Sequence, residues 1–224
     1  MHLPFAMNIF MDSRERPISM SLRPATELFS EWADAGRDEG MERGHTPSVE
    51  VMLDRLLEGR KEPFSAIDIG CGNGWVVRRL TQHPLCTRAA GVDGAPSMIA
   101  KAKAIDPEGT YTQAMLPDWR PDEPVDLVHS MEFVYYLHDP LAFLSTVHDA
   151  WMNPGGRLVI GVDHYLENPS SLDWGVSLEV HMTTLSIEAW KEGLANAGFV
   201  DIKAEQVGAK EGWSGTLVLT ANRP

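Results

Sequence analysis

The 224-residue chain has few cysteines, few basic side chains and no long apolar run. Its two cysteines are Cys71 and Cys86. Because Cys71 lies inside a glycine-rich turn, we expect no structural disulfide, and a reducing cytoplasm is the predicted location. No segment approaches the ~20 apolar residues that a membrane span needs, so no membrane partner is expected. The length fits one α/β domain with a small addition.

Basic residues are also scarce relative to acidic ones. Nineteen Lys and Arg stand against 32 Asp and Glu, which gives a formal net charge of −13 at pH 7. Such a surface repels the phosphates of nucleic acids, and the sequence shows no basic patch. We therefore expect no nucleic-acid partner.

The motifs of nucleophilic and metal catalysis are missing as well. The chain has no G-x-S-x-G elbow, no H-E-x-x-H motif and no C-x-x-C pair. These patterns mark serine hydrolases, zinc enzymes and thiol sites. We therefore predict no metal site.

The most informative segment that is present is AIDIGCGNGW, which spans residues 66–75. The apolar run at 64–69 predicts a buried strand. The alternating glycines after it predict a sharp turn where backbone approaches a ligand closely. Asp93 closes a second apolar run further along the chain. This order is typical of a nucleotide-type cofactor lying over the first strand-to-helix turn of an open α/β sheet.

The spacing of the glycines distinguishes between cofactor classes. A dinucleotide site reads G-x-G-x-x-G, whereas this chain reads D-x-G-x-G-x-G, with Asp68 ahead of the glycines and Trp75 where the third dinucleotide glycine would stand. An acidic strand end suits a cationic group, such as an amino-acid ammonium, better than a pyrophosphate. In these residues the chain resembles the class I S-adenosylmethionine-dependent methyltransferases, of the small-molecule type with a methyltransferase-11-like domain, from about residue 60 onward.

The order of the predicted elements agrees with this resemblance. We expect strands at 66–70, 89–93, 111–113, 125–131, 157–162, 200–204 and 215–220. We expect helices at 74–83, from 96 onward, at 140–151 and at 186–197, and a turn at 153–156. The last two strands have no helix between them, which predicts an antiparallel hairpin. The expected fold is a Rossmann-like three-layer α/β sandwich with a mostly parallel seven-stranded sheet.

Three segments are expected along the chain. They are a flexible leader at 1–22, an N-terminal helical lid at 23–60 and the methyltransferase domain at 61–224. The leader has no basic residue ahead of its apolar part, so we interpret it as something other than a signal peptide. Within the lid we predict a helix at 24–35, a polar link with three glycines, and a second helix that begins at Pro47 with Thr46 as its N-cap.

The resemblance implies a set of cofactor contacts. Asp68 and the glycine turn would hold the amino-acid end of S-adenosylmethionine, and Asp93 would accept hydrogen bonds from both ribose hydroxyls. Met98 would lie on the adenine, or serve only as helix core. Gln113 stands where family members often have aspartate, and its amide oxygen would replace that contact. The expected cofactor-binding residues are Asp68, Gly70, Cys71, Gly72, Asn73, Gly74, Asp93, Gly94, Met98, Gln113, Ala114, Met115, Ser130 and Met131.

The acceptor side is implied by the ends of the fourth and fifth strands. Glu132 would bind or deprotonate a substrate, or else cap the following helix. Asp163, His164 and Tyr165 stand where the family forms its acceptor pocket, and His164 is either a general base or an ordinary loop histidine. The candidate catalytic residues are His164, Tyr165 and Glu132. The candidate substrate and lid residues are Arg37, Met41, His45 and Tyr136, the alternative for 36–45 being a solvated connection.

The predicted function is transfer of a methyl group from S-adenosylmethionine to an O, N or C atom of a small molecule, with S-adenosylhomocysteine as product. Displacement from a sulfonium needs mainly proximity and orientation. Two alternatives stay open, a nicotinamide-dependent oxidoreductase and a non-catalytic cofactor-binding scaffold. We expect a monomer or homodimer.

Overall fold

The computed structural model describes residues 22–224, so the predicted leader lies outside the described residues except for Leu22. In this part of the chain seven strands form one sheet in the order β3-β2-β1-β4-β5-β7-β6. The strands are β1 (Phe64–Ile69), β2 (Cys86–Asp93), β3 (Thr110–Gln113), β4 (Val125–Met131), β5 (Met152–Val162), β6 (Val200–Val207) and β7 (Thr216–Asn222).

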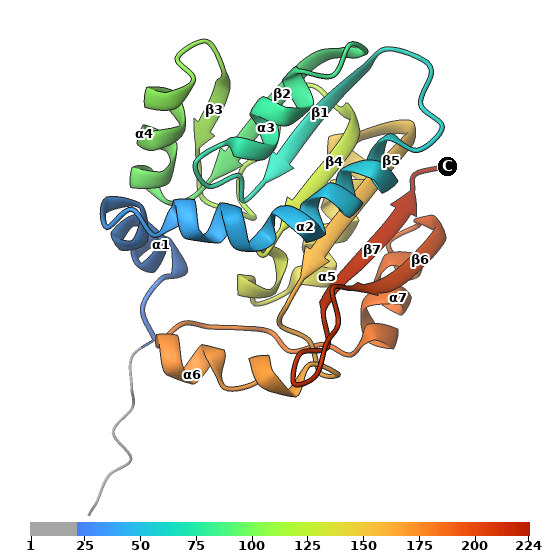
Figure 1. Cartoon of the computed structure of the whole chain (residues 1–224). Coiled ribbons are helices and arrows are strands. Elements are labelled where there is room, and N and C mark those ends of the chain that lie inside the picture. Colours follow the sequence, from blue (N-terminus) through green and yellow to red (C-terminus); the bar gives the residue numbers. More distant parts are fainter. Residues whose placement is uncertain (1–21) are drawn as a thin grey trace, which may run out of the picture.

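The first five strands run parallel, and β7 runs antiparallel to both β5 and β6. Helices lie on both faces of the sheet (Figure 1). One face carries α2 (Asp38–Leu57), α3 (Trp75–Thr81) and α4 (Pro96–Ile105), and the other carries α5 (Pro140–Thr146) and α7 (Ile187–Asn196). The predicted three-layer sandwich with a terminal antiparallel hairpin is thus confirmed.

Two apolar clusters hold these layers together. On the face of α5 and α7, the indole rings of Trp151 and Trp190 are fully buried against the sheet. On the other face, Val49, Met52 and Leu56 of α2 are fully buried against β4, β5 and β7. Burial of each such side chain stabilises the fold by about 1.5–3 kcal/mol. The second half of α2 is therefore a structural helix of the sandwich.

Local signals set where several helices begin. The Asp139 carboxylate accepts a hydrogen bond from the Ala142 N–H ahead of α5, and the Ser186 hydroxyl accepts one from Ala189 ahead of α7. The predicted helix at 140–151 is confirmed, with its last turn at Val147–Trp151 wound as a π-helix. None of the helices in residues 22–224 is long and apolar enough to span a membrane.

The link predicted within the N-terminal segment is wrong. Residues 38–57 form one continuous helix that contains Gly40, Gly44 and Pro47. Thr46 is not an N-cap, because its hydroxyl donates to the carbonyl of Glu42 one turn back. The apolar side of the helix packs on the sheet, and the Asp38 carboxylate in its first turn is bonded to Asn73 and Lys101. These contacts stabilise the helix although it contains residues of low helix propensity.

The turn predicted at 153–156 is also different in the structure. These residues belong to β5, and the register shifts where Val125 and Leu127 pair with Met152 and Arg157. Gly155 takes a φ of +76°, and its N–H donates to the carbonyl of Arg223. Hydrogen bonds to neighbouring segments thus convert the expected turn into an irregular start of a strand.

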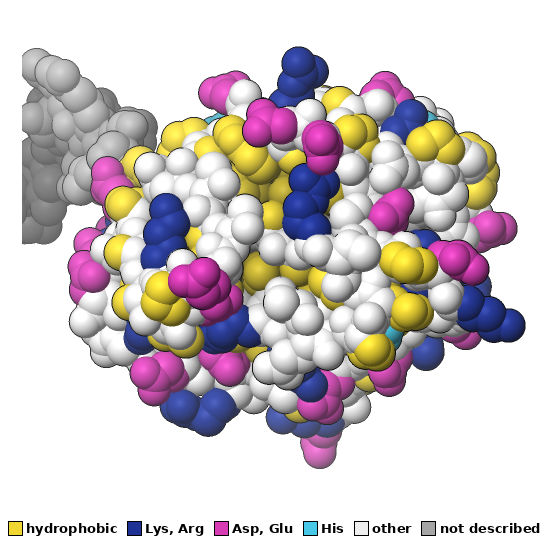
Figure 2. All heavy atoms as spheres, turned by 90° about the horizontal axis from the view of Figure 1, so that it is seen from above, with side chains coloured by type: hydrophobic (Ala, Val, Ile, Leu, Met, Phe, Trp, Pro, Cys, Tyr) yellow, Lys and Arg dark blue, Asp and Glu magenta, His cyan; other side chains and the backbone are white. Residues whose placement is uncertain are grey.

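Figure 2 shows the molecule from above, turned by 90° from the view of Figure 1. On this face Lys and Arg side chains are scattered among Asp and Glu, with apolar side chains between them. No continuous basic surface covers this face, in keeping with the net charge of the chain.

Candidate active site

The carboxyl ends of β1, β2, β4 and β5 open into a cavity of about 810 Å³. Three further elements enclose it: α1 (Ala25–Asp34), the first half of α2, and α6 (Trp174–Leu178). They lie along the same edge of the sheet (Figure 1). Ligands of open α/β sheets bind at this edge, so the cavity is the candidate site.

The glycine turn forms one wall of the cavity. Its three glycines have φ values of +72° at Gly70, +52° at Gly72 and +79° at Gly74. A Cβ at Gly70 would lie 2.5 Å from Cβ of Phe133, and one at Gly74 would lie 2.4 Å from the ring of Tyr111. Space for a Cβ exists only at Gly72, which lines the cavity. Gly74 therefore serves packing, Gly70 both packs against Phe133 and lines the cavity, and Gly72 keeps the backbone open to a ligand.

Asp68, just before the turn, is buried beside a histidine that the sequence analysis did not single out. His129 pairs with Asp68 across β1 and β4, and its Nδ1 lies 2.7 Å from Asp68 Oδ1. The imidazole is fully buried, and its Nε2 has no hydrogen-bond partner within the described residues. A donor at Nδ1 orients the carboxylate that lines the cavity. The missed signal was the register, because equivalent positions on adjacent parallel strands meet.

Asp93 joins the ends of β1 and β2. Its carboxylate accepts hydrogen bonds from the N–H groups of Gly72, at 2.9 Å, and Ala95, at 2.7 Å. Burial raises the pKa of this carboxyl, while the backbone donors act in the opposite direction. The side chain lines the cavity with acceptor capacity left for a ligand.

The first turn of α2 is clamped onto the glycine turn. Asp38 is the first residue of α2, and its side chain is only 2% exposed. Its carboxylate accepts a hydrogen bond from Asn73 Nδ2 at 2.9 Å. Lys101 of α4 lies 2.7 Å from the same carboxylate. The Lys101 and Asn73 hydrogen bonds lower the pKa of Asp38 although burial raises it. This clamp fixes the helix that covers the cavity.

The residues expected around an adenine divide into two groups. Met98 is buried and lines the cavity together with Gly94 and Met115. Gln113 is exposed, its amide donates to the carbonyl of Gly94 at 3.3 Å, and neither it nor Ala114 lines the cavity. The structure therefore does not bring the Gln113 amide to the site.

The end of β4 contributes unequally to the cavity. Met131 lines it, whereas the buried Ser130 hydroxyl donates to the carbonyl of Ile69 and holds β1 and β4 together. Cys71 lines the cavity, and burial raises the pKa of its thiol well above the ordinary value, which keeps it protonated.

At the far end, three titratable side chains converge from α2, β4 and β5. One ring nitrogen of His45 and one carboxylate oxygen each of Glu132 and Asp163 all lie within 4.8 Å of one another. Glu132 has a φ of +55°, and its carboxylate accepts from the Tyr135 hydroxyl at 2.6 Å and the Asp163 N–H at 2.5 Å. Such a strained backbone is retained at functional sites. Burial, followed by the charge of Asp163, raises the pKa of Glu132 well above its ordinary value.

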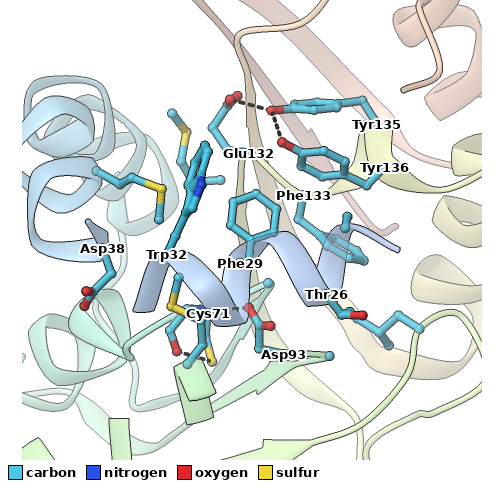
Figure 3. A pocket seen from close by; sticks show the side chains of 18 of the residues that line it. Thr26, Phe29, Trp32, Asp38, Cys71, Asp93, Glu132, Phe133, Tyr135 and Tyr136 are labelled. Carbon is cyan, nitrogen blue, oxygen red and sulfur yellow. Dashed lines mark hydrogen bonds between the residues drawn. The ribbon is translucent and has the colours of Figure 1, made fainter. Parts of the chain in front are cut away.

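A row of aromatic rings lies beside this cluster. Ring centroids are 5.4 Å apart for Trp32 and Phe29, 5.3 Å for Phe29 and Tyr136, and 4.5 Å for Tyr136 and Tyr135. Figure 3 shows the row along the cavity, with the hydroxyls of Tyr135 and Tyr136 near Glu132. Phe29 and Trp32 lie on α1, the helix that the sequence predicts at 24–35. Their role follows from the placement of α1 over the cavity.

Two candidate catalytic residues lie elsewhere. His164 is 1% exposed, with Nδ1 donating to the Ser171 carbonyl and Nε2 bonded to the Thr184 hydroxyl. Tyr165 is fully buried and donates to the Gly215 carbonyl. Neither lines the cavity, and burial lowers the pKa of His164. This placement fits the alternative of a loop histidine, because both ring nitrogens of His164 hold loops together.

Of the four candidate substrate and lid residues, three line the cavity and one does not. Met41 and His45 line the cavity from α2, as does Tyr136 from the short helical turn at Val134–Tyr136. Arg37 is exposed at the N-terminus of α2 and does not line the cavity. Among the candidate lid residues, only Arg37 has the solvated position that was the alternative.

Comparison with known proteins places this geometry in a family. A family model described as a methyltransferase domain matches residues 45–204. Trans-aconitate 2-methyltransferase of Escherichia coli (strain SE11) is 30% identical over 122 residues, which are 54% of this chain and 47% of that protein. The chain thus matches about half the length of the curated relatives.

Solved structures show the same fold. A chain in the complex between the Haloferax volcanii Trm112 methyltransferase activator and a methyltransferase has 28% identity and a TM-score of 0.73, covering 88% of this chain and 97% of that one. The S-adenosylmethionine-dependent methyltransferase of Mesorhizobium loti has 23% identity and a TM-score of 0.66, covering 80% and 97%. The family match, the glycine turn and this fold together show that the chain belongs to the class I S-adenosylmethionine-dependent methyltransferases.

Proposed function

We propose that this chain transfers a methyl group from S-adenosylmethionine to a small-molecule acceptor held in the cavity. The observation that carries the proposal is the open Gly72 backbone between the carboxylates of Asp68 and Asp93, at the edge of a cavity of about 810 Å³. Cavities of about 300–1,000 Å³ are typical of small-molecule sites. The enclosing helices favour a compact acceptor over a macromolecule.

The residues present fit this cofactor. Asp68, oriented by His129, would receive the ammonium group, and Asp93 would receive the ribose hydroxyls. Met98, Gly94 and Met115 would surround the adenine. Cys71, Asn73 and Met131 complete the wall of the cavity. Gly70 lines the cavity beside Gly72, and Gly74 and Ser130 shape that wall from behind.

The chain's contribution to the reaction is positioning. Bound S-adenosylmethionine would supply an electrophilic methyl group, and the acceptor would attack its carbon in line with the carbon–sulfur bond, which breaks and leaves S-adenosylhomocysteine. The clamp of Asp38 on Asn73 holds α2 over the cavity and excludes water. A nicotinamide oxidoreductase is not favoured, because the glycine spacing and the family both differ.

Calorimetry with S-adenosylhomocysteine tests this proposal. We expect a one-to-one complex, and Asp93→Ala should weaken it by about a hundredfold, since hydrogen bonds to a charged group contribute about 1.5–3 kcal/mol each. Glu192→Gln, which removes an exposed carboxylate, is the control and should bind like the original protein. Failure of the original protein to bind, or equal binding by Asp93→Ala, would contradict the proposal.

The assembly and location are also proposed. The Haloferax relative was solved with an activator protein, whereas we propose that this chain binds its cofactor as a monomer or homodimer. Light scattering with and without S-adenosylhomocysteine measures this, and a chain that binds only after a second protein is added would contradict it. The free thiols of Cys71 and Cys86 favour a reducing cytoplasm.

A further inference from the structure

The charges that line the cavity are strongly one-sided. Six carboxylates line it: Asp38, Glu42, Asp68, Asp93, Glu132 and Asp163. Among the described Lys and Arg side chains only Arg23 does so, and it is paired with Glu31. A substrate that brings its own negative charge would meet repulsion here.

Most of these carboxylates have assigned partners. Asp38 pairs with Lys101, Asp68 with His129, and Glu42 lies 3.4 Å from Asn73 Nδ2. Asp93 accepts from two backbone N–H groups. Glu132 and Asp163 have no Lys or Arg partner within residues 22–224. Glu132 accepts hydrogen bonds from Tyr135 and the Asp163 N–H, and Asp163 has a hydrogen bond from Thr216. The basic group that faces Asp163 is His45, whose Nε2 lies 3.8 Å from Asp163 Oδ2.

Asp163 has a buried carboxylate oxygen that lacks a hydrogen-bond donor within the described residues. Its side chain is 8% exposed, and that oxygen is Oδ1. Buried carboxylate oxygens without a donor are costly, and a few are retained at functional sites. Burial raises the pKa of Asp163 and lowers that of His45, so burial favours the neutral forms of both side chains. A cation placed there would stabilise the carboxylate instead.

The aromatic row favours an organic cation. The rings of Trp32, Phe29 and Tyr136 contact one another in a row beside the carboxylates of Glu132 and Asp163. The rings and the carboxylates line the same cavity. Cations bind at aromatic faces with about 0.5–2 kcal/mol, and apolar bodies gain from burial. A metal ion would use the carboxylates but not the rings.

We propose that the methyl acceptor is an amine on an apolar or aromatic body, whose ammonium form is bound by Asp163 and Glu132. This proposal rests on the proposed function. The ammonium nitrogen passes one proton to Asp163 and so regains its lone pair. That pair forms the new bond to the methyl carbon as the carbon–sulfur bond breaks and its electrons stay on sulfur. The product is the protonated N-methyl amine together with S-adenosylhomocysteine.

Matched probes test the acceptor class. With the S-adenosylhomocysteine complex of the full chain, we would measure binding of 2-phenylethylamine, benzylamine and tryptamine against phenylacetate, benzoate and indole-3-acetate. The amines should bind at least tenfold more tightly than the carboxylates. Asp163→Asn should weaken amine binding by at least tenfold and leave S-adenosylhomocysteine affinity unchanged. Glu192→Gln should change neither.

The outcomes separate this inference from the proposed function. Loss of S-adenosylhomocysteine binding in the original protein contradicts the proposed function. Intact cofactor binding with carboxylates bound as well as amines, or with amine binding unaffected by Asp163→Asn, overturns the amine assignment. Titration with ZnCl₂ and MnCl₂ alone is a further arm. The three side chains are spaced closely enough to bind a metal ion. Micromolar metal binding that disappears in His45→Ala would therefore assign the cluster to a metal ion instead.

A turnover experiment completes the test. The full chain is incubated with S-adenosylmethionine and equal panels of primary amines, phenols and carboxylic acids, and products are identified by mass spectrometry. N-methyl products are expected from the amines, with yields that fall at least tenfold in Asp163→Asn. Methyl esters or methyl ethers as the main products would overturn the proposal.

Discussion

The two ends of the cavity are built in different ways. The cofactor end is formed by residues close together in the sequence, at the ends of β1 and β2, and its carboxylates are paired by His129 or by backbone N–H groups. The proposed acceptor end brings His45, Glu132 and Asp163 together from distant segments. There Glu132 accepts hydrogen bonds from Tyr135 and the Asp163 N–H, but Asp163 Oδ1 has no hydrogen-bond partner within the described residues. The difference between the two ends is therefore one buried carboxylate oxygen, Asp163 Oδ1, that lacks a donor within the described residues.

The largest expected effect tests the completeness of the cofactor end. Gly70→Ala should lower the melting temperature by about 4–20 °C. The left-handed φ costs about 1–2 kcal/mol and the contact with Phe133 about 1–3 kcal/mol, and each kcal/mol shifts a domain of this size by about 2–4 °C. Differential scanning calorimetry measures the shift.

Gly36→Ala is the matched control for this variant. Gly36 has a φ of +70° but nothing within 4 Å of the added Cβ. It should therefore show only the backbone cost, about 2–8 °C. Equal shifts in both variants would mean that Phe133 yields easily and that the turn is not tightly packed.

A smaller effect is expected at His129. His129→Phe keeps a ring in the buried position but removes the donor to Asp68. S-adenosylhomocysteine should bind about tenfold more weakly, because one hydrogen bond to a charged group contributes about 1.5 kcal/mol. Calorimetry beside a melting curve separates affinity from folding. Unchanged affinity in a folded variant would show that Asp68 needs no orienting partner.

The smallest effect concerns the stability of the acceptor end. Because burial raises the folded-state pKa of Asp163, protonation contributes stability that is complete below the unfolded pKa and is lost as the pH rises through the folded pKa. Asparagine does not ionise, so Asp163→Asn should not lose this stability as the pH rises. The variant should melt about 2–4 °C above the original protein at pH 8 but not at pH 4. His45 and Glu132, which face Asp163, remain in both proteins.

Thermal melts across this pH range check the sign. Glu192→Gln, with its exposed carboxylate, should follow the original protein at every pH. A lower melting temperature for Asp163→Asn at pH 8 would show that the buried carboxylate is stabilising and that the acceptor end is as well paired as the cofactor end.

Local patterns were sufficient for much of the fold and for the cofactor end. The strand at 125–131 and the terminal hairpin follow from apolar runs, and the turn between Asp68 and Asp93 follows from its glycines. The helix at 38–57 was missed because Gly40, Gly44 and Pro47 are breakers whose local preference was overridden by packing. His164 was overvalued because sequence position does not show that both ring nitrogens are already bonded.

By itself the sequence determined the strand-to-helix order, the glycine turn and the two acidic strand ends, because backbone conformation and side-chain period depend on neighbours along the chain. Only the tertiary structure decided that α1 and α2 cover the cavity, that His129 orients Asp68, and that Glu132 and Asp163 meet near His45. Those contacts depend on which strand ends lie side by side and on which side chains lose their water. Burial and long-range charge therefore set the acceptor end, and the local pattern set the cofactor end.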